Sequence, residues 1–199
     1  LPEAENETID VWAFSNCNEA ELFLNGRSLG RKRKGPLDKF TWQVPYEKGV
    51  LRAVAYEKGQ AVCEDCSITA GPPAKLVLEP DRDTLAADGA DISVVSVTVV
   101  DSHGNAVTDA DLTVHFNVSG AGTIKGVGNG RPDSLEHDKL PVRKLYAGRA
   151  VVLVESTFQA GEAILTASAD YVEPAVLRLR CEEGVPEPRI PGCWTEERG

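Results

Sequence analysis

The chain has 199 residues, of which 42% are hydrophobic and 26% charged, a composition typical of a globular protein of one or two domains. Its formal net charge of -10 at pH 7 argues against nucleic acid and anionic membranes as partners, because both attract clustered Lys and Arg. No apolar stretch approaches the ~20 residues that a membrane-spanning helix needs, and the absence of methionine indicates a processed product or a piece of a longer protein.

The strongest local signal is Asn25-Gly26, which separates two short apolar runs. Asn-Gly in this setting is typical of a two-residue β-hairpin turn. Such a turn sets the register and places Leu22 opposite Leu29. Leu22, Leu24 and Leu29 then share a face that can cover a core. Phe23 points the other way, and what covers it matters for function.

Short strand signals follow one another along the chain, and no window shows a convincing helical period, so an all-β fold is predicted. In the first segment we expect strands at 8–14, 20–24, 27–31, 40–44, 50–56 and 60–69. The basic run Arg31–Lys34 precedes Gly35-Pro36, which favours a solvated loop over a polyanion site. Adjacent prolines in Gly71-Pro72-Pro73 cannot donate to a ladder. We therefore expect a small β-sandwich over residues 1–70 and a linker at 71–74.

The second segment, residues 75–181, also reads as strands. Val95, Val97 and Val99 alternate with polar residues, which predicts one buried and one solvated face. About seven short strands in such a length fit an immunoglobulin-like sandwich. Residues 182–199 are rich in Pro and Glu and are expected to form an irregular tail. The predicted architecture is thus two tandem immunoglobulin-like β-sandwich domains. The expected strands are 75–79, 92–100, 112–118, 150–154, 163–169 and 175–180.

Two motifs suggest ligand chemistry that their context argues against. Gly126–Gly130 could form a phosphate loop, but Arg131-Pro132-Asp133 follows it instead of a Lys-Ser/Thr pair at a helix start, which favours a strained turn between strands. The acidic residues Asp81, Asp83, Asp88 and Asp91 could hold calcium, but EF-hand spacing is absent and a solvated acidic turn is favoured. We expect no metal site and no cofactor.

Five cysteines are an odd number for a disulfide framework, which favours reduced thiols. Cys63 and Cys66 have the spacing of a zinc half-site or a redox motif. They lie in a predicted strand, however, and the chain has no second pair of this kind. Buried or edge thiols are therefore the preferred interpretation.

No residue is assigned a catalytic role. Glu7 and Glu19 each follow an asparagine, as do the acids of many glycosidases. Glycoside hydrolysis needs two carboxylates about 5–9 Å apart in a cleft, and the start of a hairpin strand offers no cleft. Serines and histidines in the chain do not make a catalytic triad by composition alone.

Aromatic residues in the first segment provide the most plausible binding chemistry. Flat rings often pack against the C–H groups of sugars, whereas a small sandwich also needs aromatic side chains in its core and for contacts between domains. Both interpretations stay open. The candidate carbohydrate-binding residues are Trp12, Phe23, Trp42, Tyr46 and Tyr56.

Residues 11–30, which read VWAFSNCNEAELFLNGRSLG, together with 41–46 resemble the β-sandwich module that follows the catalytic barrel of bacterial glycoside hydrolase family 2 β-galactosidases. The second segment resembles the bacterial Ig-like domain that often follows that module. The residues that carry this second resemblance are 85–89, 97–101, 126–130 and 148–150.

The resemblance implies a parent enzyme that is a retaining β-glycosidase, with two catalytic glutamates on a barrel of which this chain contains no part. We therefore expect the chain to be catalytically inert and to support or shape the barrel, its intramolecular partner. Two alternatives remain: a carbohydrate-binding module that uses exposed aromatic residues, with a glycan as partner, and an adhesin-like cell-surface protein. The compartment is left open.

Overall fold

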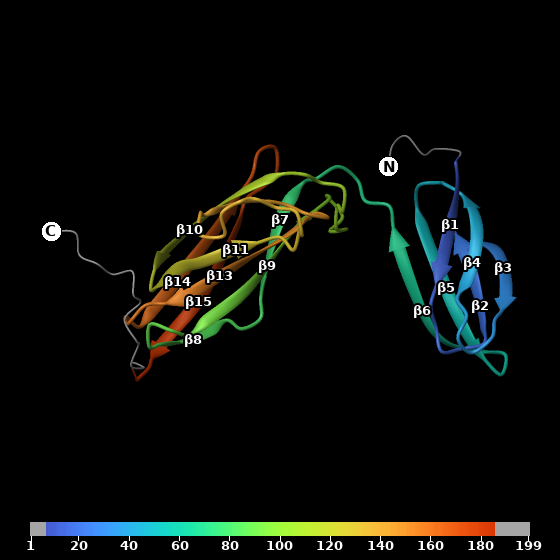
Figure 1. Ribbon diagram of the computed structural model, residues 1–199, viewed down its shortest axis with the longest axis horizontal. Coiled ribbons are helices and arrows are strands. Elements are labelled where there is room, and N and C mark those ends of the chain that lie inside the picture. Colours follow the sequence, from blue (N-terminus) through green and yellow to red (C-terminus); the bar gives the residue numbers. More distant parts are fainter. Residues whose placement is uncertain (1–6, 186–199) are drawn as a thin grey trace. The chain divides into compact units, whose positions relative to one another are not determined.

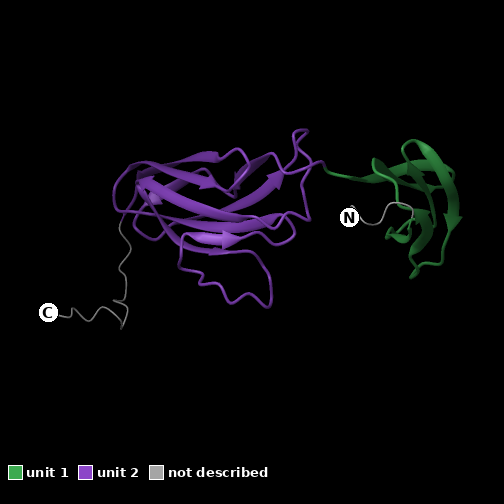
Figure 2. Ribbon diagram, turned by 90° about the horizontal axis from the view of Figure 1, so that it is seen from above, with its two compact units in different colours: residues 1–70 green, residues 71–199 purple. Residues whose placement is uncertain are grey.

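The computed structural model describes residues 7–185 (Figure 1). Every regular element in this range is a β-strand, which confirms the all-β prediction. Figure 2 shows the two compact units into which the chain divides, residues 1–70 and 71–199. Among the described residues, no helix is long and apolar enough to cross a bilayer.

The first unit contains a two-stranded sheet, in the order β1-β4, and a four-stranded sheet, in the order β3-β2-β5-β6. Apolar residues of β4, among them Phe40 and Trp42, form a core cluster with Leu22 and Leu24 of β2. The two sheets therefore enclose one core. The strands are β1 (Thr8–Ala13), β2 (Glu19–Leu24), β3 (Arg27–Arg33), β4 (Phe40–Pro45), β5 (Val50–Glu57) and β6 (Gln60–Ile68).

The predicted hairpin forms β2 and β3 with Asn25 and Gly26 in the turn, both at positive φ. Leu22, Leu24 and Leu29 do share the core face. The predicted pairing of Leu22 with Leu29 is wrong, because the register shifts between Glu21 and Phe23 and one extra residue of β3 is accommodated there.

The sequence suggested a loop for the basic run Arg31–Lys34, but its first three residues lie in a strand and only Lys34 lies beyond it. β3 continues to Arg33, which pairs with Glu19 of β2. β3 is an edge strand, and cationic side chains suit this position because they discourage pairing with other chains. Alternate residues of the run consequently point to opposite faces of the sheet.

The second unit contains a five-stranded sheet, in the order β12-β10-β14-β15-β8, and a four-stranded sheet, in the order β11-β13-β9-β7. Most neighbours are antiparallel, but β15 and β8 run parallel. The strands are β7 (Lys75–Pro80), β8 (Thr84–Ala87), β9 (Ile92–Val100), β10 (Thr113–Gly120), β11 (Gly122–Gly128), β12 (Val142–Lys144), β13 (Arg149–Ser156), β14 (Gly161–Ser168) and β15 (Ala175–Glu183).

Alternation within these strands decides what is buried. Val95, Val97 and Val99 are fully buried, as predicted, whereas Ser96 between them is exposed. In β10, Val114 and Phe116 are buried and the intervening His115 is exposed, which confirms it as a solvent-side strand residue. Burial of such apolar side chains stabilises by roughly 1.5–3 kcal/mol each.

Two expectations for this unit need correction. Gly126 and Gly128 lie within β11, not in a turn. Of the three glycines in this motif, only Gly130, beyond the strand end, has a positive φ, of 71°. The predicted tail begins too early, because β15 extends to Glu183 and pairs there with β8. Residues 186–199 lie outside the described part of the chain.

Candidate functional site

Phe23 and Tyr56 lie on the outer face of the four-stranded sheet, and an arginine covers each ring. The guanidinium of Arg52 is 4.8 Å from the ring centre of Phe23, and that of Arg31 is 3.5 Å from the ring centre of Tyr56. Tyr56 also donates its hydroxyl to Glu21 at 3.2 Å. Such cation–π contacts stabilise by about 0.5–1 kcal/mol at exposed sites. The arginines occupy the ring faces that a sugar would otherwise cover.

Trp42 is a core residue, with 2% of its surface exposed. Its ring stacks on Phe40 with centroids 5.8 Å apart. The indole Nε1 donates to the carbonyl oxygen of Gly30 at 3.1 Å. Gly30 lies where the register of β2 and β3 shifts, and its carbonyl supplies the acceptor that a buried indole needs. Trp42 therefore has no face available to a glycan.

Tyr46 follows β4 and is half-buried, with its backbone N–H donating to the Glu7 carbonyl at 2.8 Å. Trp12 is 54% exposed, with the ammonium of Lys39 3.0 Å from its ring centre. Phe14, two residues further on, is 76% exposed and was not among the predicted binding residues. The predicted aromatic residues are thus divided among different surfaces, and large exposed rings of the first unit occur at Trp12 and Phe14.

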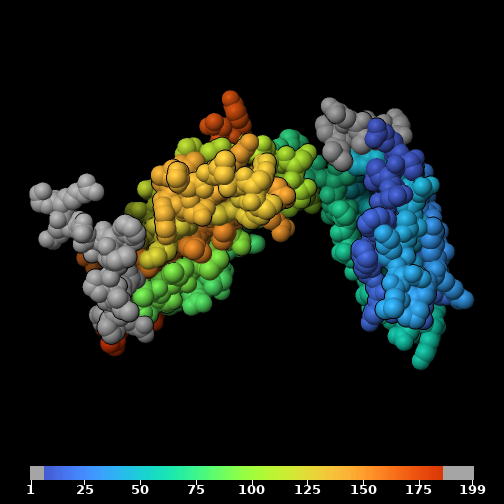
Figure 3. All heavy atoms as spheres, in the orientation of Figure 1, coloured from blue at the N-terminus to red at the C-terminus, as the bar shows by residue number. Residues whose placement is uncertain are grey.

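A groove of about 370 Å³ opens beside Trp12 and Phe14. It is lined by residues of β1 and β6, whose surfaces are blue and green in Figure 3. Its lining includes apolar side chains of the four-stranded sheet, among them Leu22, Leu51 and Ala53. Small-molecule sites are commonly apolar hollows of about 300–1,000 Å³. The groove therefore has the size and the apolar lining of a small-molecule site.

Cys63 and Cys66 are free and exposed on the edge strand β6, as predicted. Residues three positions apart on a strand point to opposite faces, so these two thiols cannot form one half of a zinc site. Cys181 is buried, and burial raises the pKa of its thiol. Within residues 7–185, no group of three or more His, Cys, Asp or Glu side chains could hold a metal ion.

Three of the four acidic residues considered for calcium, Asp81, Asp88 and Asp91, instead accept hydrogen bonds from backbone N–H groups. Asp81 accepts from Val94 at 2.7 Å, and Asp88 accepts from Ala90 at 2.7 Å and from Asp91 at 2.8 Å. These N–H donors hold the pKa of the Asp81 and Asp88 carboxyls below the ordinary value. The cluster is therefore accounted for by turn structure.

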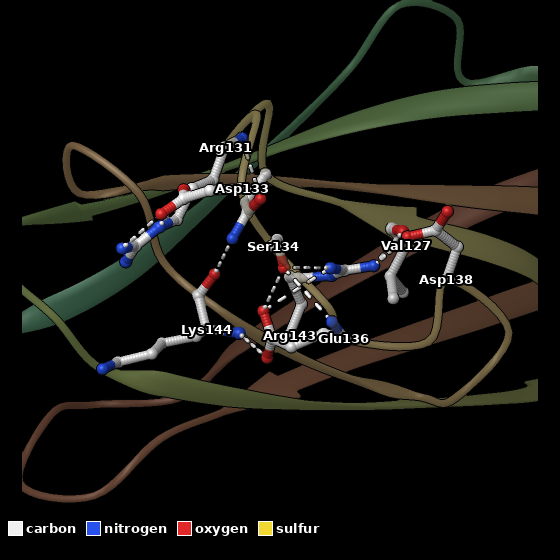
Figure 4. A network of polar contacts seen from close by, with 9 residues as sticks. Val127, Arg131, Asp133, Ser134, Glu136, Asp138, Arg143 and Lys144 are labelled. Atoms are coloured by element: carbon white, nitrogen blue, oxygen red, sulfur yellow. Dashed lines mark hydrogen bonds and ion pairs between the residues drawn. The ribbon is translucent and has the colours of Figure 1, made fainter.

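Sequence reasoning missed Arg143, which is buried beneath the loop 129–141 (Figure 4). Its guanidinium donates to the Val127 carbonyl at 2.9 Å and to Ser134 Oγ at 3.3 Å, and it pairs with Glu136 at 3.5 Å and with Asp138. Buried arginines are stable only with such partners. Arg143 and Lys144 lie in a polar segment without the alternation of apolar and polar residues that would have indicated burial.

The Arg143 side chain joins the two sheets of the second unit at one edge. Arg143 belongs to β12 in one sheet, and its acceptor Val127 belongs to β11 in the other. The Val127 N–H in turn donates to the Asp138 carbonyl at 2.8 Å, and Asn129 donates its amide to the Lys144 carbonyl at 2.8 Å. These bonds hold the long loop against the sandwich, which is a structural role.

Two family models match the chain. The one described as glycoside hydrolase family 2 C-terminal domain 5 matches residues 76–178, just over half of the chain. A domain of unknown function, DUF4982, matches residues 6–63. The two matches fall in the second and first units respectively.

Known proteins agree with the first of these matches. Beta-galactosidase BoGH2A of Bacteroides ovatus is 43% identical over 180 residues, which is 89% of this chain and 21% of that protein. A putative beta-glucuronidase of Formosa agariphila is 30% identical over 168 residues, 81% of this chain and 16% of that protein. A crystal structure of a glycosyl hydrolase family 2 member from Bacteroides cellulosilyticus has a TM-score of 0.87 at 36% identity, covering 89% of this chain and 25% of that one.

The chain spans about a fifth of the length of the curated relatives it matches. The similarity is to part of each relative, and the larger match is to a domain described as C-terminal. These findings confirm the resemblance inferred from the sequence. The chain belongs to the glycoside hydrolase family 2 C-terminal domain 5 family and corresponds to the C-terminal accessory region of family 2 enzymes.

Proposed function

We propose that this chain is the non-catalytic C-terminal region of a family 2 glycoside hydrolase that cleaves β-galactosides, where it supports the catalytic barrel or shapes the substrate entrance. The observation that carries the proposal is the 43% identity over 89% of the chain to a protein named beta-galactosidase. Both units take part in the similarity, since the matched length exceeds either unit alone.

The names of the relatives indicate two classes of substrate for the parent enzyme, β-galactosides and β-glucuronides. A second protein named beta-galactosidase, from Thermoanaerobacter pseudethanolicus, is 31% identical, and two Formosa agariphila proteins with beta-glucuronidase in their names are 30% and 28% identical. The higher identity supports a galactoside. The family match also supports a glycosidase over the adhesin-like alternative.

An exchange of regions tests the supporting role. The matched region of Beta-galactosidase BoGH2A would be deleted in one variant and replaced by this chain in another. We expect the deletion to lower the melting temperature and activity on 4-nitrophenyl β-D-galactoside, and the replacement to restore both. A replacement no better than the deletion would contradict the proposal.

The isolated chain tests catalytic inertness. We expect no release of 4-nitrophenol from the β-galactoside or the β-glucuronide by purified chain, because Glu19, the candidate acid in the hairpin, is bound by Arg31 and Arg33. Turnover that co-purifies with the chain and disappears in a Glu19→Gln variant would overturn this expectation.

A second candidate function is glycan binding at Phe14 and at the face of Trp12 that Lys39 leaves open, because both rings are exposed beside an apolar groove. Calorimetry with galacto-oligosaccharides tests it. We expect binding that weakens about tenfold or more in a Trp12→Ala, Phe14→Ala variant, since stacked aromatic rings carry much of sugar binding. The matched control is Tyr171→Ala, which removes a 99% exposed ring of the second unit. Equal binding by all three proteins, or none by the parent chain, would exclude this site.

A further inference from the structure

A second hollow of the first unit, of about 970 Å³, is rich in cationic residues. It lies where β3 ends and β5 turns into β6. Figure 1 shows these two segments at one end of the unit. Five cations and two acids line it, Arg31 and Arg33 from the outer face of the edge strand β3 and Lys32 from its inner face, an excess of three positive charges in a chain whose net charge is -10. The cations are Arg31, Lys32, Arg33, Lys34 and Lys58, and the acids are Glu19 and Glu57.

Internal ion pairs neutralise little of this charge. Arg31 and Arg33 share the single carboxylate of Glu19, the first at 3.4 Å. Lys32 donates to the Thr41 carbonyl at 2.7 Å, and a carbonyl satisfies the ammonium without cancelling its charge. Lys34 likewise donates to a backbone carbonyl, that of the next residue, at 3.2 Å.

Lys58 is the fifth cation of the cationic hollow and comes from the turn between β5 and β6. It occupies the β5–β6 turn at φ 50°, followed by Gly59 at φ 84°, a pair of left-handed residues typical of a tight hairpin turn. Across residues 7–185, no carboxylate pairs with Lys58 or with the two lysines of the basic run. The turn therefore fixes a free ammonium next to the end of β3.

We propose that this cationic hollow binds an acidic saccharide through its carboxylate or sulfate groups. The choice of a saccharide rests on the proposed function, whereas the cationic character of the hollow does not. Single-stranded nucleic acid would need free aromatic faces for its bases, but the Tyr56 ring in the hollow is already covered by Arg31 at 3.5 Å. A hydroxyl-rich polyanion needs only charge and hydrogen-bond donors, both of which are present.

Affinity electrophoresis of the whole chain tests the proposal. The gels contain polygalacturonate for carboxylate groups, dextran sulfate for sulfate groups, or neutral galactan and dextran. We expect retardation by one or both acidic polymers and none by the neutral ones. Because ion contacts are screened, the apparent affinity should fall roughly tenfold or more between 50 and 300 mM salt.

Matched variants locate the site. Arg33→Gln, Lys34→Gln, Lys58→Gln removes three cations of the hollow, and Lys75→Gln, Arg149→Gln, Arg178→Gln removes three exposed cations of the second unit. We expect about a tenfold loss of affinity in the first variant and an unchanged affinity in the second. Circular dichroism checks that both fold. If Arg33→Gln, Lys34→Gln, Lys58→Gln fails to fold, the single Lys58→Gln variant replaces it, with a loss of about threefold expected.

Several outcomes would overturn the proposal: no retardation by either acidic polymer, equal loss in both variants, or tighter binding of single-stranded oligothymidylate than of the acidic polysaccharides. The exchange in BoGH2A measures stability and turnover of a neutral substrate. Its failure would remove the proposed function without affecting a measured affinity for acidic polymers, so the two failures can be told apart.

Discussion

The carboxylate of Asp101 accepts a hydrogen bond from the backbone N–H of Gly71 at 2.8 Å. The same carboxylate accepts from the backbone of His103 and from both the backbone and the side chain of Asn105, at 2.9–3.0 Å. One buried aspartate thus joins the first residue of the second unit to the loop that follows β9. The loop sequence Asp-Ser-His-Gly-Asn, residues 101–105, is typical of a turn.

Acid should weaken this junction. Hydrogen bonds from Gly71 and Asn105 hold the pKa of Asp101 far below its ordinary value of 3.8. A lowered folded-state pKa means that the stabilisation is complete above the ordinary value and is lost as the pH falls below it toward the folded-state pKa. Below about pH 4, we expect the urea concentration at which the second unit is half unfolded to fall as the pH falls. The fall should be less steep in Asp101→Asn. The exposed Asp109→Asn serves as control, and equal slopes in all three proteins would contradict the prediction.

The buried indole of Trp42 should be sensitive to loss of its polar atom. Trp42→Phe removes the donor and leaves the Gly30 carbonyl without its indole partner. We expect the free energy of unfolding of the first unit to fall by about 1–3 kcal/mol, from hydrogen-bond loss and reduced packing. Trp12→Phe, at a half-exposed ring, should change it by no more than about 0.5 kcal/mol. Urea denaturation followed by fluorescence measures both changes. Equal losses of stability in the two variants would contradict the prediction.

Arg143 should be needed to hold the loop 129–141 against the sandwich. Arg143→Ala removes the buried cation and its hydrogen bond to the Val127 carbonyl, but Asp138 and Glu136 are exposed enough to be hydrated, so the cost should be about 1–3 kcal/mol. We expect a matching loss of stability in the second unit and rapid proteolysis within the loop. The exposed pair Arg178 and Glu162 provides the control, because Arg178→Ala should cost no more than about 1 kcal/mol. An intact loop in Arg143→Ala would show that other contacts hold it.

Tyr171 should be replaceable with a gain in stability. It is 99% exposed and has φ 64°, a left-handed conformation that costs a residue with a side chain roughly 1–2 kcal/mol. Tyr171→Gly relieves that cost but adds backbone entropy to the unfolded chain, so we expect a net gain of about 0.5–1 kcal/mol. Thermal denaturation checks this. A loss of stability would mean that the ring or the turn makes stabilising contacts.

Local signals in the sequence were sufficient for the fold class and for most strands. Asn25-Gly26 predicted a hairpin because few residue pairs adopt two left-handed conformations in succession. The alternation of Val95, Val97 and Val99 predicted their burial because successive strand residues face opposite sides of a sheet. The similarity to family 2 accessory domains could also be read from ordered motifs, since it depends on residue identity.

Only the tertiary structure decided which aromatic residues are accessible and which charged residue is buried. Trp12 and Trp42 lie in similar strand patterns, but Trp42 faces the neighbouring sheet and Trp12 faces solvent. Arg143 is buried because β11 and β12 belong to different sheets and meet at one edge, beneath a loop of carboxylates. Sheet order depends on contacts between residues far apart in the chain, and no local pattern of charge or hydrophobicity contains that information.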